Sequence, residues 1–89
     1  MSYQIHYHHE ILSDIADIPK NLKIRIRSAI EGRLLKDPIK YGEPLRRSYQ
    51  GYRKLRVGDY RIIYRVNKKE VVVLKIGHRK EVYKKVRKE

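Results

Sequence analysis

The chain has 89 residues, of which 40% are apolar and none is cysteine, and its formal net charge is +13. This length allows one domain, residues 1–89, and the lack of cysteine excludes disulfides and thiolate metal sites. No apolar run approaches the ~18 residues of a membrane span, and no signal peptide is recognisable, so we expect a cytoplasmic protein.

The positive charge is concentrated in the second half of the chain. Residues 1–44 contain seven Lys or Arg and six Asp or Glu, whereas residues 45–89 contain sixteen and four. Many of these charges alternate with apolar residues, which puts them on one face of a sheet. Such a surface attracts polyanions, so nucleic acid is the first partner to consider.

The first half of the chain predicts a strand and two helices. Apolar residues alternate from Tyr3 to Tyr7, which is typical of a half-buried strand. Residues 11–18 change to helical spacing, and Pro19 suits the start of a second helix. That helix should end at Asp37, because the residue before a proline disfavours the α region. Residues 38–50 are expected to form a loop.

The second half predicts three strands and a short helix. Residues 71–76 form the most apolar strand and are expected at the centre of the sheet. The fold class is therefore α+β, with an N-terminal strand, a helical hairpin, a three-stranded antiparallel meander and a short C-terminal helix. The last four elements of this prediction are strands at residues 53–57, 60–66 and 71–76 and a helix at residues 81–88.

The same alternation assigns the two faces of the sheet. The helical hairpin should cover a face formed by Leu55, Val57, Ile62 and Tyr64. The opposite face, either open or closed by a partner, should carry Lys54, Arg56, Arg61 and Arg65.

Two segments carry a family resemblance. Residues 52–64, YRKLRVGDYRIIY, and residues 76–83, IGHRKEVY, resemble the core signature of the RelE/ParE toxin superfamily. The order of elements and the length also agree. The resemblance implies the toxin of a type II toxin–antitoxin module, with a cognate antitoxin as partner. RelE-like members cut messenger RNA in the ribosomal A site, whereas ParE-like members inhibit DNA gyrase and generally lack the nuclease residues.

The resemblance also implies roles for individual residues. Lys54 falls on a catalytic lysine, and Arg61 on an arginine that contacts the scissile phosphate. Arg79 matches a second catalytic arginine, and Tyr83 an aromatic residue that stacks on a nucleotide base. The RelE-like pattern has another lysine two residues before Lys54, where this chain has Tyr52. This departure favours the alternative, a ParE-like gyrase inhibitor without nuclease activity.

The chemistry of RNA cleavage fits the same residues. Attack by the 2′-hydroxyl needs a proton acceptor, positive charge for the phosphorane and a donor to the leaving 5′-oxygen. Neighbouring cations lower the pKa of a lysine, so that a larger fraction of it is the free amine that can accept a proton. The planar fork of arginine suits phosphate. We therefore expect a metal-independent endoribonuclease with Lys54, Arg61, Arg79 and Tyr83 as catalytic residues and His78 as an auxiliary acid or base. The residues expected to bind RNA are Arg53, Arg56, Arg65, Lys80 and Lys84.

Each assignment has a structural alternative. Lys54 could be a solvated surface charge, Tyr83 a core aromatic residue and His78 a strand-end residue. The terminal basic segment could be only a solvated face. No metal or cofactor is expected. Of His6, His8 and His9, only two lie on the same strand face, and two ligands are too few for a metal site.

Overall fold

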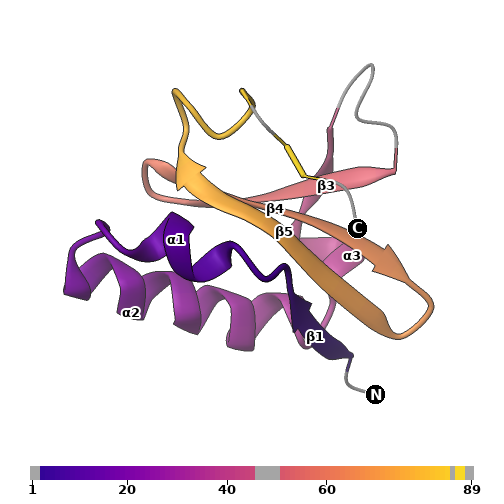
Figure 1. The fold of residues 1–89 in the computed structure, drawn as a ribbon. Coiled ribbons are helices and arrows are strands. Elements are labelled where there is room, and N and C mark those ends of the chain that lie inside the picture. Colours follow the sequence, from indigo (N-terminus) through magenta and orange to yellow (C-terminus); the bar gives the residue numbers. More distant parts are fainter. Residues whose placement is uncertain (1–2, 46–50, 85, 88–89) are drawn as a thin grey trace.

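Helices cover one face of a mixed, five-stranded sheet whose strand order is β1-β5-β4-β3-β2. The computed structural model describes residues 3–45, 51–84 and 86–87. Figure 1 shows α1 and α2 on one side of the sheet and the segment after β5 on the other. Within these described residues, no helix has the length and apolar character needed to cross a membrane.

The first half of the chain forms the predicted strand and helical hairpin. Its elements are β1 (Gln4–Tyr7), α1 (Ile11–Ile15), α2 (Lys20–Ala29) and η1 (Ile30–Leu34). Pro19 precedes α2 in an extended conformation, and η1 continues α2 as a π-helical turn. The helical segment ends before Asp37, as the proline that follows predicts. β1 pairs in parallel with β5 and so joins the N-terminus to the sheet.

The loop expected over residues 38–50 is wrong in its first part. Asp37 begins a new helix, α3 (Pro38–Tyr41), and its side chain accepts a hydrogen bond from the backbone N–H of Lys40. The chain then forms β2 (Glu43–Pro44), which pairs with β3 so that Glu43 lies opposite Lys54. Residues 46–50 of the expected loop lie outside the described residues.

The three predicted antiparallel strands are confirmed as β3 (Tyr52–Val57), β4 (Tyr60–Asn67) and β5 (Glu70–His78). The turn between β3 and β4 needs Gly58, whose φ of 58° favours glycine. The expectation that residues 71–76 form the central strand is wrong, because β4 occupies the middle of the sheet and β5 lies between β1 and β4. The register between β4 and β5 shifts after Ile63, which leaves Leu74 as an extra residue.

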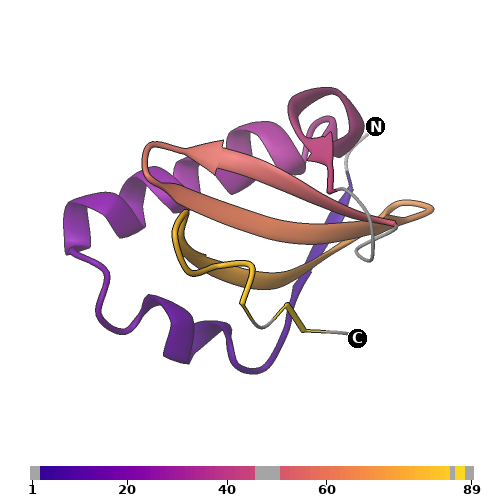
Figure 2. The same ribbon diagram turned by 90° about the horizontal axis from the view of Figure 1, so that it is seen from above.

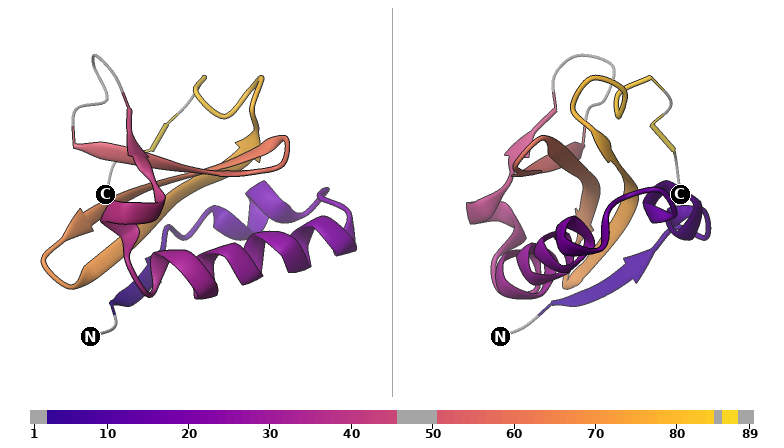
Figure 3. Two further views of the ribbon diagram at one scale, coloured as in Figure 1. Left: turned by 180° about the vertical axis from the view of Figure 1, so that it is seen from behind. Right: turned by 90° about the vertical axis from the view of Figure 1, so that its left-hand side faces the viewer.

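Figure 3 shows from two further sides how the helices lie against one face of the sheet, and the main core lies between these two layers. Leu55, Ile62 and Tyr64 of the sheet share this core with Ile26 and Ile30 of the helical segment. This confirms the prediction that Leu55, Ile62 and Tyr64 of β3 and β4 face the helices. A second group of fully buried residues lies outside this core cluster and consists of Ile63, Leu74 and Val82.

The C-terminal helix expected over residues 81–88 is wrong for its described part. Residues 79–84 form turns, in which Val82 N–H donates to the carbonyl of His78 and Lys84 N–H donates to that of Glu81. A helix of this length is marginal by itself, so tertiary contacts decide its conformation. Figures 1 and 2 show the segment after β5 on the side of the sheet away from α2. Arg87 Nη1 donates to the Leu74 carbonyl of β5.

Tyr64→Phe is expected to lower the free energy of unfolding by about 1–3 kcal/mol. The Tyr64 hydroxyl donates to the Pro38 carbonyl at 2.6 Å in a buried position, and the variant removes this bond. Burial also raises the pKa of Tyr64, whereas the hydrogen bond and charge of Arg53 act in the opposite direction.

A raised folded-state pKa makes ionisation favour the unfolded chain. The contribution of Tyr64 is therefore present below a pH of about 10 and is lost as the pH rises above it. Urea unfolding at neutral and alkaline pH measures both effects. Tyr41→Phe, at an exposed position, is the control and should change neither the free energy of unfolding nor its dependence on pH. Equal stability of the two variants would contradict the structural role of the Tyr64 hydroxyl.

Candidate nucleic-acid interface

Basic side chains gather on the face of the sheet opposite to α1 and α2. The register of β3 and β4 pairs Arg56 with Arg61, and Tyr52 with Arg65. Ile62 belongs to the helix-side core, so its neighbour Arg61 points the other way, as the period of two predicts. Lys54 lies opposite Ile63 on the same side as Arg61. We call Lys54, Arg56, Arg61 and Arg65 the cationic face.

Lys54 is the residue of this face with the most informative surroundings. Its ammonium group lies 5.8 Å from the centroid of the Tyr83 ring. It also lies 3.8 Å from a carboxylate oxygen of Glu43, and 29% of its side chain is exposed. The fold therefore brings a cation, an aromatic ring and a carboxylate together from three separate segments of the chain.

Arg61 is buried, unlike an arginine that binds phosphate from the solvated surface. It is the one residue among the buried positions of the described chain that carries a charge, with 8% exposed. Its Nη1 donates to the carbonyls of Gly58 at 3.0 Å and Tyr60 at 2.9 Å. These bonds fix the guanidinium beside the turn between β3 and β4. Arg56, its partner in the register, is exposed.

Arg79 and His78 lie at the end of β5. The backbone N–H of Arg79 donates to the carbonyl of Asp59, and its Nε lies 3.8 Å from the Asp59 carboxylate. His78 Nδ1 accepts a hydrogen bond from the backbone N–H of Lys80, and its ring packs edge-on against Tyr60 at 5.7 Å. These contacts give His78 the strand-end position that its structural alternative describes.

The expected RNA-binding residues are divided between two sides of the sheet. Arg53 lies on the helix side, where Nη2 donates to the carbonyls of Ile39 at 2.7 Å and Gly42 at 3.0 Å. It therefore fastens α3 to β3 and lies away from the cationic face. Arg65 is half-buried, with its guanidinium carbon 6.0 Å from the centroid of the Tyr52 ring. Two exposed lysines follow β5 in the C-terminal turns, Lys80 and Lys84.

Sequence reasoning missed two charged residues near Lys54. A surface hollow of about 270 Å³ at the edge of β3 is lined by Arg33 and Glu43 together with Lys54 and Arg56. Arg33 comes from η1, and no local pattern connects it with β3. The signal for Glu43 was the Glu43-Pro44 pair, since proline is tolerated on an edge strand, but two residues are too short to show alternation.

Among residues 3–45, 51–84 and 86–87, one group of side chains has potential metal ligands close together. His8, His9 and Glu10 bring ligand atoms within 4.8 Å of one another. His8 Nδ1 already accepts from the Glu10 backbone N–H at 3.1 Å, and the Glu10 carboxylate lies 3.8 Å from Arg87 Nε. Both contacts compete with a metal for these groups. The expectation that the protein needs no metal stays a prediction.

Comparison with known proteins identifies relatives along most of the chain. The family model described as ParE toxin of type II toxin–antitoxin system, parDE, matches residues 5–83. Toxin RelG of Mycobacterium tuberculosis (strain ATCC 25618 / H37Rv) is 29% identical over 86 residues, which cover 94% of this chain and 99% of that protein. Toxin RelE of the same strain is 29% identical over 73 residues, with coverage of 80% and 75%.

Solved structures share the fold. The toxin–antitoxin complex RelBE2 from Mycobacterium tuberculosis contains a chain with a TM-score of 0.82 and 28% identity, covering 88% of this chain and 99% of that one. A chain in the RelB–RelE antitoxin–toxin complex from Methanococcus jannaschii has a TM-score of 0.70 and 24% identity, with coverage of 88% and 94%. The second likeness concerns the fold alone.

Proposed function

Because the chain belongs to the ParE toxin family of type II toxin–antitoxin systems, we propose that it arrests translation by cutting messenger RNA on the ribosome. The observation that carries this proposal is the position of Lys54, with Nζ 5.8 Å from the centroid of the Tyr83 ring. A cation beside an aromatic ring suits a phosphate and the base next to it. The resemblance to RelE-like toxins gives these two residues the same roles.

The reaction is attack of the 2′-oxygen on the adjacent phosphorus, which expels the 5′-oxygen of the next nucleotide. The products are a 2′,3′-cyclic phosphate and a 5′-hydroxyl. The protein must accept the 2′ proton, stabilise the phosphorane and supply a proton to the leaving oxygen. Positioning and electrostatics can carry this reaction without a metal.

The roles can be divided among the residues near Lys54. Lys54 supplies positive charge to the phosphorane, since it is already paired with the Glu43 carboxylate at 3.8 Å. That carboxylate would act as the acceptor of the 2′ proton. Arg61 and Arg56 add charge from the same face, and Arg79 reaches the phosphate or the leaving oxygen from the end of β5.

Tyr83→Phe is expected to keep most of the cleavage activity, whereas Tyr83→Ala should lose roughly tenfold or more, because stacking is worth ~1–3 kcal/mol per base. Stacking needs the ring and not the hydroxyl. Single-turnover cleavage by each purified variant measures the difference, and thermal unfolding shows whether the ring also supports the fold. Equal losses in both variants at unchanged stability would make the hydroxyl the reacting group and contradict stacking.

A second candidate function is inhibition of DNA gyrase without RNA cleavage. The observation in its favour is Tyr52, whose ring lies beneath Arg65 at the position where the RelE-like pattern has a lysine. The family that matches the chain is also named for the ParE toxin. Inhibition of gyrase supercoiling by the purified protein, with messenger RNA intact, would favour this function.

We also infer a cognate antitoxin as partner. The chains of similar fold from Mycobacterium tuberculosis and Methanococcus jannaschii come from toxin–antitoxin complexes. An acidic antitoxin segment would complement a chain of net charge +13 and could cover the cationic face. A covered Lys54 would no longer reach RNA, which explains how the same partner would also inhibit the toxin.

A reconstituted translation reaction tests the proposed activity. We expect purified protein to cut a translated messenger RNA at discrete positions when ribosomes are present, and to leave it intact when they are omitted. A chain of this size has little surface with which to read a long RNA alone. Equal cutting with and without ribosomes would contradict the ribosome dependence, and no cutting in either reaction would contradict the nuclease.

A further inference from the structure

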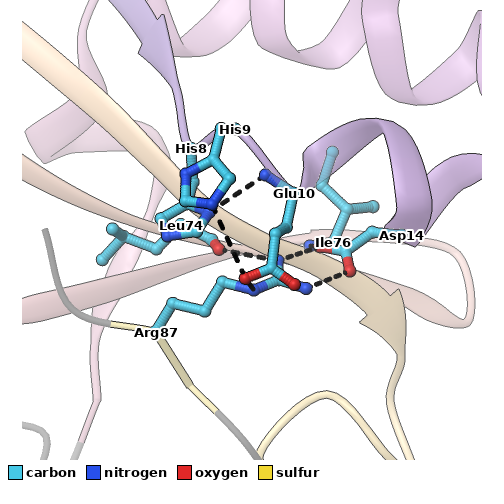
Figure 4. A network of polar contacts seen from close by, with 7 residues as sticks. All are labelled: His8, His9, Glu10, Asp14, Leu74, Ile76 and Arg87. Carbon is cyan, nitrogen blue, oxygen red and sulfur yellow. Dashed lines mark hydrogen bonds and ion pairs between the residues drawn. The ribbon is translucent and has the colours of Figure 1, made fainter.

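A partly buried ion pair links the C-terminal segment to α1. Arg87 Nη1 and Nη2 donate to the two carboxylate oxygens of Asp14, at 2.6 and 2.7 Å (Figure 4). The side chains are 18% and 8% exposed. We call this pair the Asp14–Arg87 clasp. Its bidentate geometry is the strongest form of a charge-assisted hydrogen bond.

The clasp also closes an edge of the sheet. β1 pairs with β5 only as far as Val73, so the later residues of β5 lack a strand on that side. Asp14 Oδ2 accepts from the Ile76 backbone N–H at 3.1 Å, and Arg87 Nη1 donates to the Leu74 carbonyl at 3.2 Å. Figure 4 shows these bonds meeting at the guanidinium and the carboxylate. Two side chains therefore do what a neighbouring strand would do.

The segment between β5 and the clasp carries Tyr83. At its start, the Arg79 N–H donates to the Asp59 carbonyl. In its middle, Val82 is fully buried, and a side chain added at Gly77 would lie 3.4 Å from it. At its end, Arg87 is held by Asp14. Tyr83 lies next to the buried valine, with its ring near Lys54.

We propose that Asp14 and Arg87 are positioning residues, which hold the C-terminal segment so that Tyr83 stays beside Lys54 and can receive a nucleotide base. This inference rests on the proposed function. Three anchors act on a segment whose described residues form turns and no regular helix or strand. Loss of the last anchor removes the tie on the C-terminal side of Tyr83, while the sheet and the helices keep their core.

The first test measures the motion of the segment without RNA. In Arg87→Ala, we expect the backbone order parameters of residues 82–84 to fall from about 0.85 to below about 0.6, while those of β4 stay unchanged. Arg27→Ala is the matched control, because it removes the same charge from an exposed ion pair with Glu31. Unchanged order at residues 82–84, or equal loosening of β4, would overturn the proposal.

The second test is a double-mutant cycle between Tyr83 and Arg87, read as the affinity for a short single-stranded oligouridine. In the unaltered chain, Tyr83→Ala should weaken binding about tenfold or more, as expected for the loss of one stacked base. In the Arg87→Ala background, the same change should weaken binding less than twofold, because the ring is already misplaced. A merely structural role for Arg87 predicts equal, additive losses, and that result would overturn the proposal.

Arg87→Lys keeps the test decisive if Arg87→Ala does not fold. Lysine keeps the charge but lacks the fork that binds both carboxylate oxygens, so the order of residues 82–84 should fall below that of the unaltered chain. Order equal to that of the unaltered chain would overturn the clasp. If Tyr83→Ala alone leaves RNA binding unchanged, the stacking role fails, and the order parameters still decide whether the clasp holds the segment.

Discussion

Lys54→Ala is expected to lower the rate of RNA cleavage by about 10²–10³-fold, the usual loss when one preorganised donor to a transition state is removed. The ammonium group lies on the cationic face between Glu43 and Tyr83, where the phosphate would bind. The fold should survive, because a partly exposed ion pair contributes at most about 1 kcal/mol. Single-turnover cleavage of a ribosome-bound messenger RNA measures the rate, and thermal unfolding measures the stability.

Two further variants decide how Lys54 acts. Lys54→Arg keeps the positive charge but cannot accept a proton, so it should keep more activity than the alanine variant if Lys54 supplies charge. Equal losses in the two variants would instead make Lys54 the base. Lys36→Ala removes an exposed lysine outside the cationic face and should cleave normally. Full activity of Lys54→Ala would remove Lys54 from the mechanism.

Gly42→Ala is expected to lower the free energy of unfolding by about 3 kcal/mol or more, at or above the upper end of the usual cost of overpacking. A Cβ at Gly42 would overlap the hydroxyl of Tyr64 and lie 2.9 Å from the Lys54 backbone carbonyl. Neither atom can move easily, since the hydroxyl donates to Pro38 and the carbonyl belongs to β3. Unfolding in guanidinium chloride measures the loss.

Gly32→Ala is the matched control for this substitution. Gly32 lies in η1, and a Cβ at that position would meet nothing within 4 Å. Alanine is favoured over glycine within a helical segment by roughly 0.5–1 kcal/mol, so this variant should be at least as stable as the unaltered chain. Similar effects of the two substitutions would contradict the close approach of α3, β2 and Tyr64. That approach is what holds Glu43 opposite Lys54.

The side chains of β3 and β4 that face the helices could be predicted from the sequence, because successive side chains of a strand point to opposite faces of the sheet. Ile62 and Arg61 were separated correctly by that rule alone. The same alternation also places Arg53. Arg53 has the same parity as Leu55 and therefore points towards the helices, where it binds backbone carbonyls of α3 and of Gly42. Its charge suggested RNA, whereas its parity indicated a structural contact.

The surroundings of Lys54 could not be predicted, because they depend on contacts between distant segments. Glu43 reaches Lys54 through a two-residue strand that follows an unexpected helix. Arg33 reaches the same corner from η1. No local periodicity encodes either approach, since both depend on how closely the helical segment packs against the edge of β3.

The C-terminal segment was predicted wrongly for a similar reason. The spacing of Val82 and Val86 favours a helix, but residues 79–84 form turns, and Arg87 binds Asp14, which lies 73 residues away in the sequence. Their bonds draw the chain back across β5. A pairing of this kind leaves no trace in a local pattern of apolar residues.

Primer extension on messenger RNA from cells that express the protein tests the central claim most directly. We expect discrete cuts within translated codons soon after induction, no such cuts with Lys54→Ala, and normal cutting with Lys36→Ala. Mapping the same transcripts with their start codons removed should abolish the cuts, because the substrate would no longer enter the ribosome. Intact transcripts in cells that stop growing and accumulate DNA damage would contradict the nuclease and support gyrase inhibition.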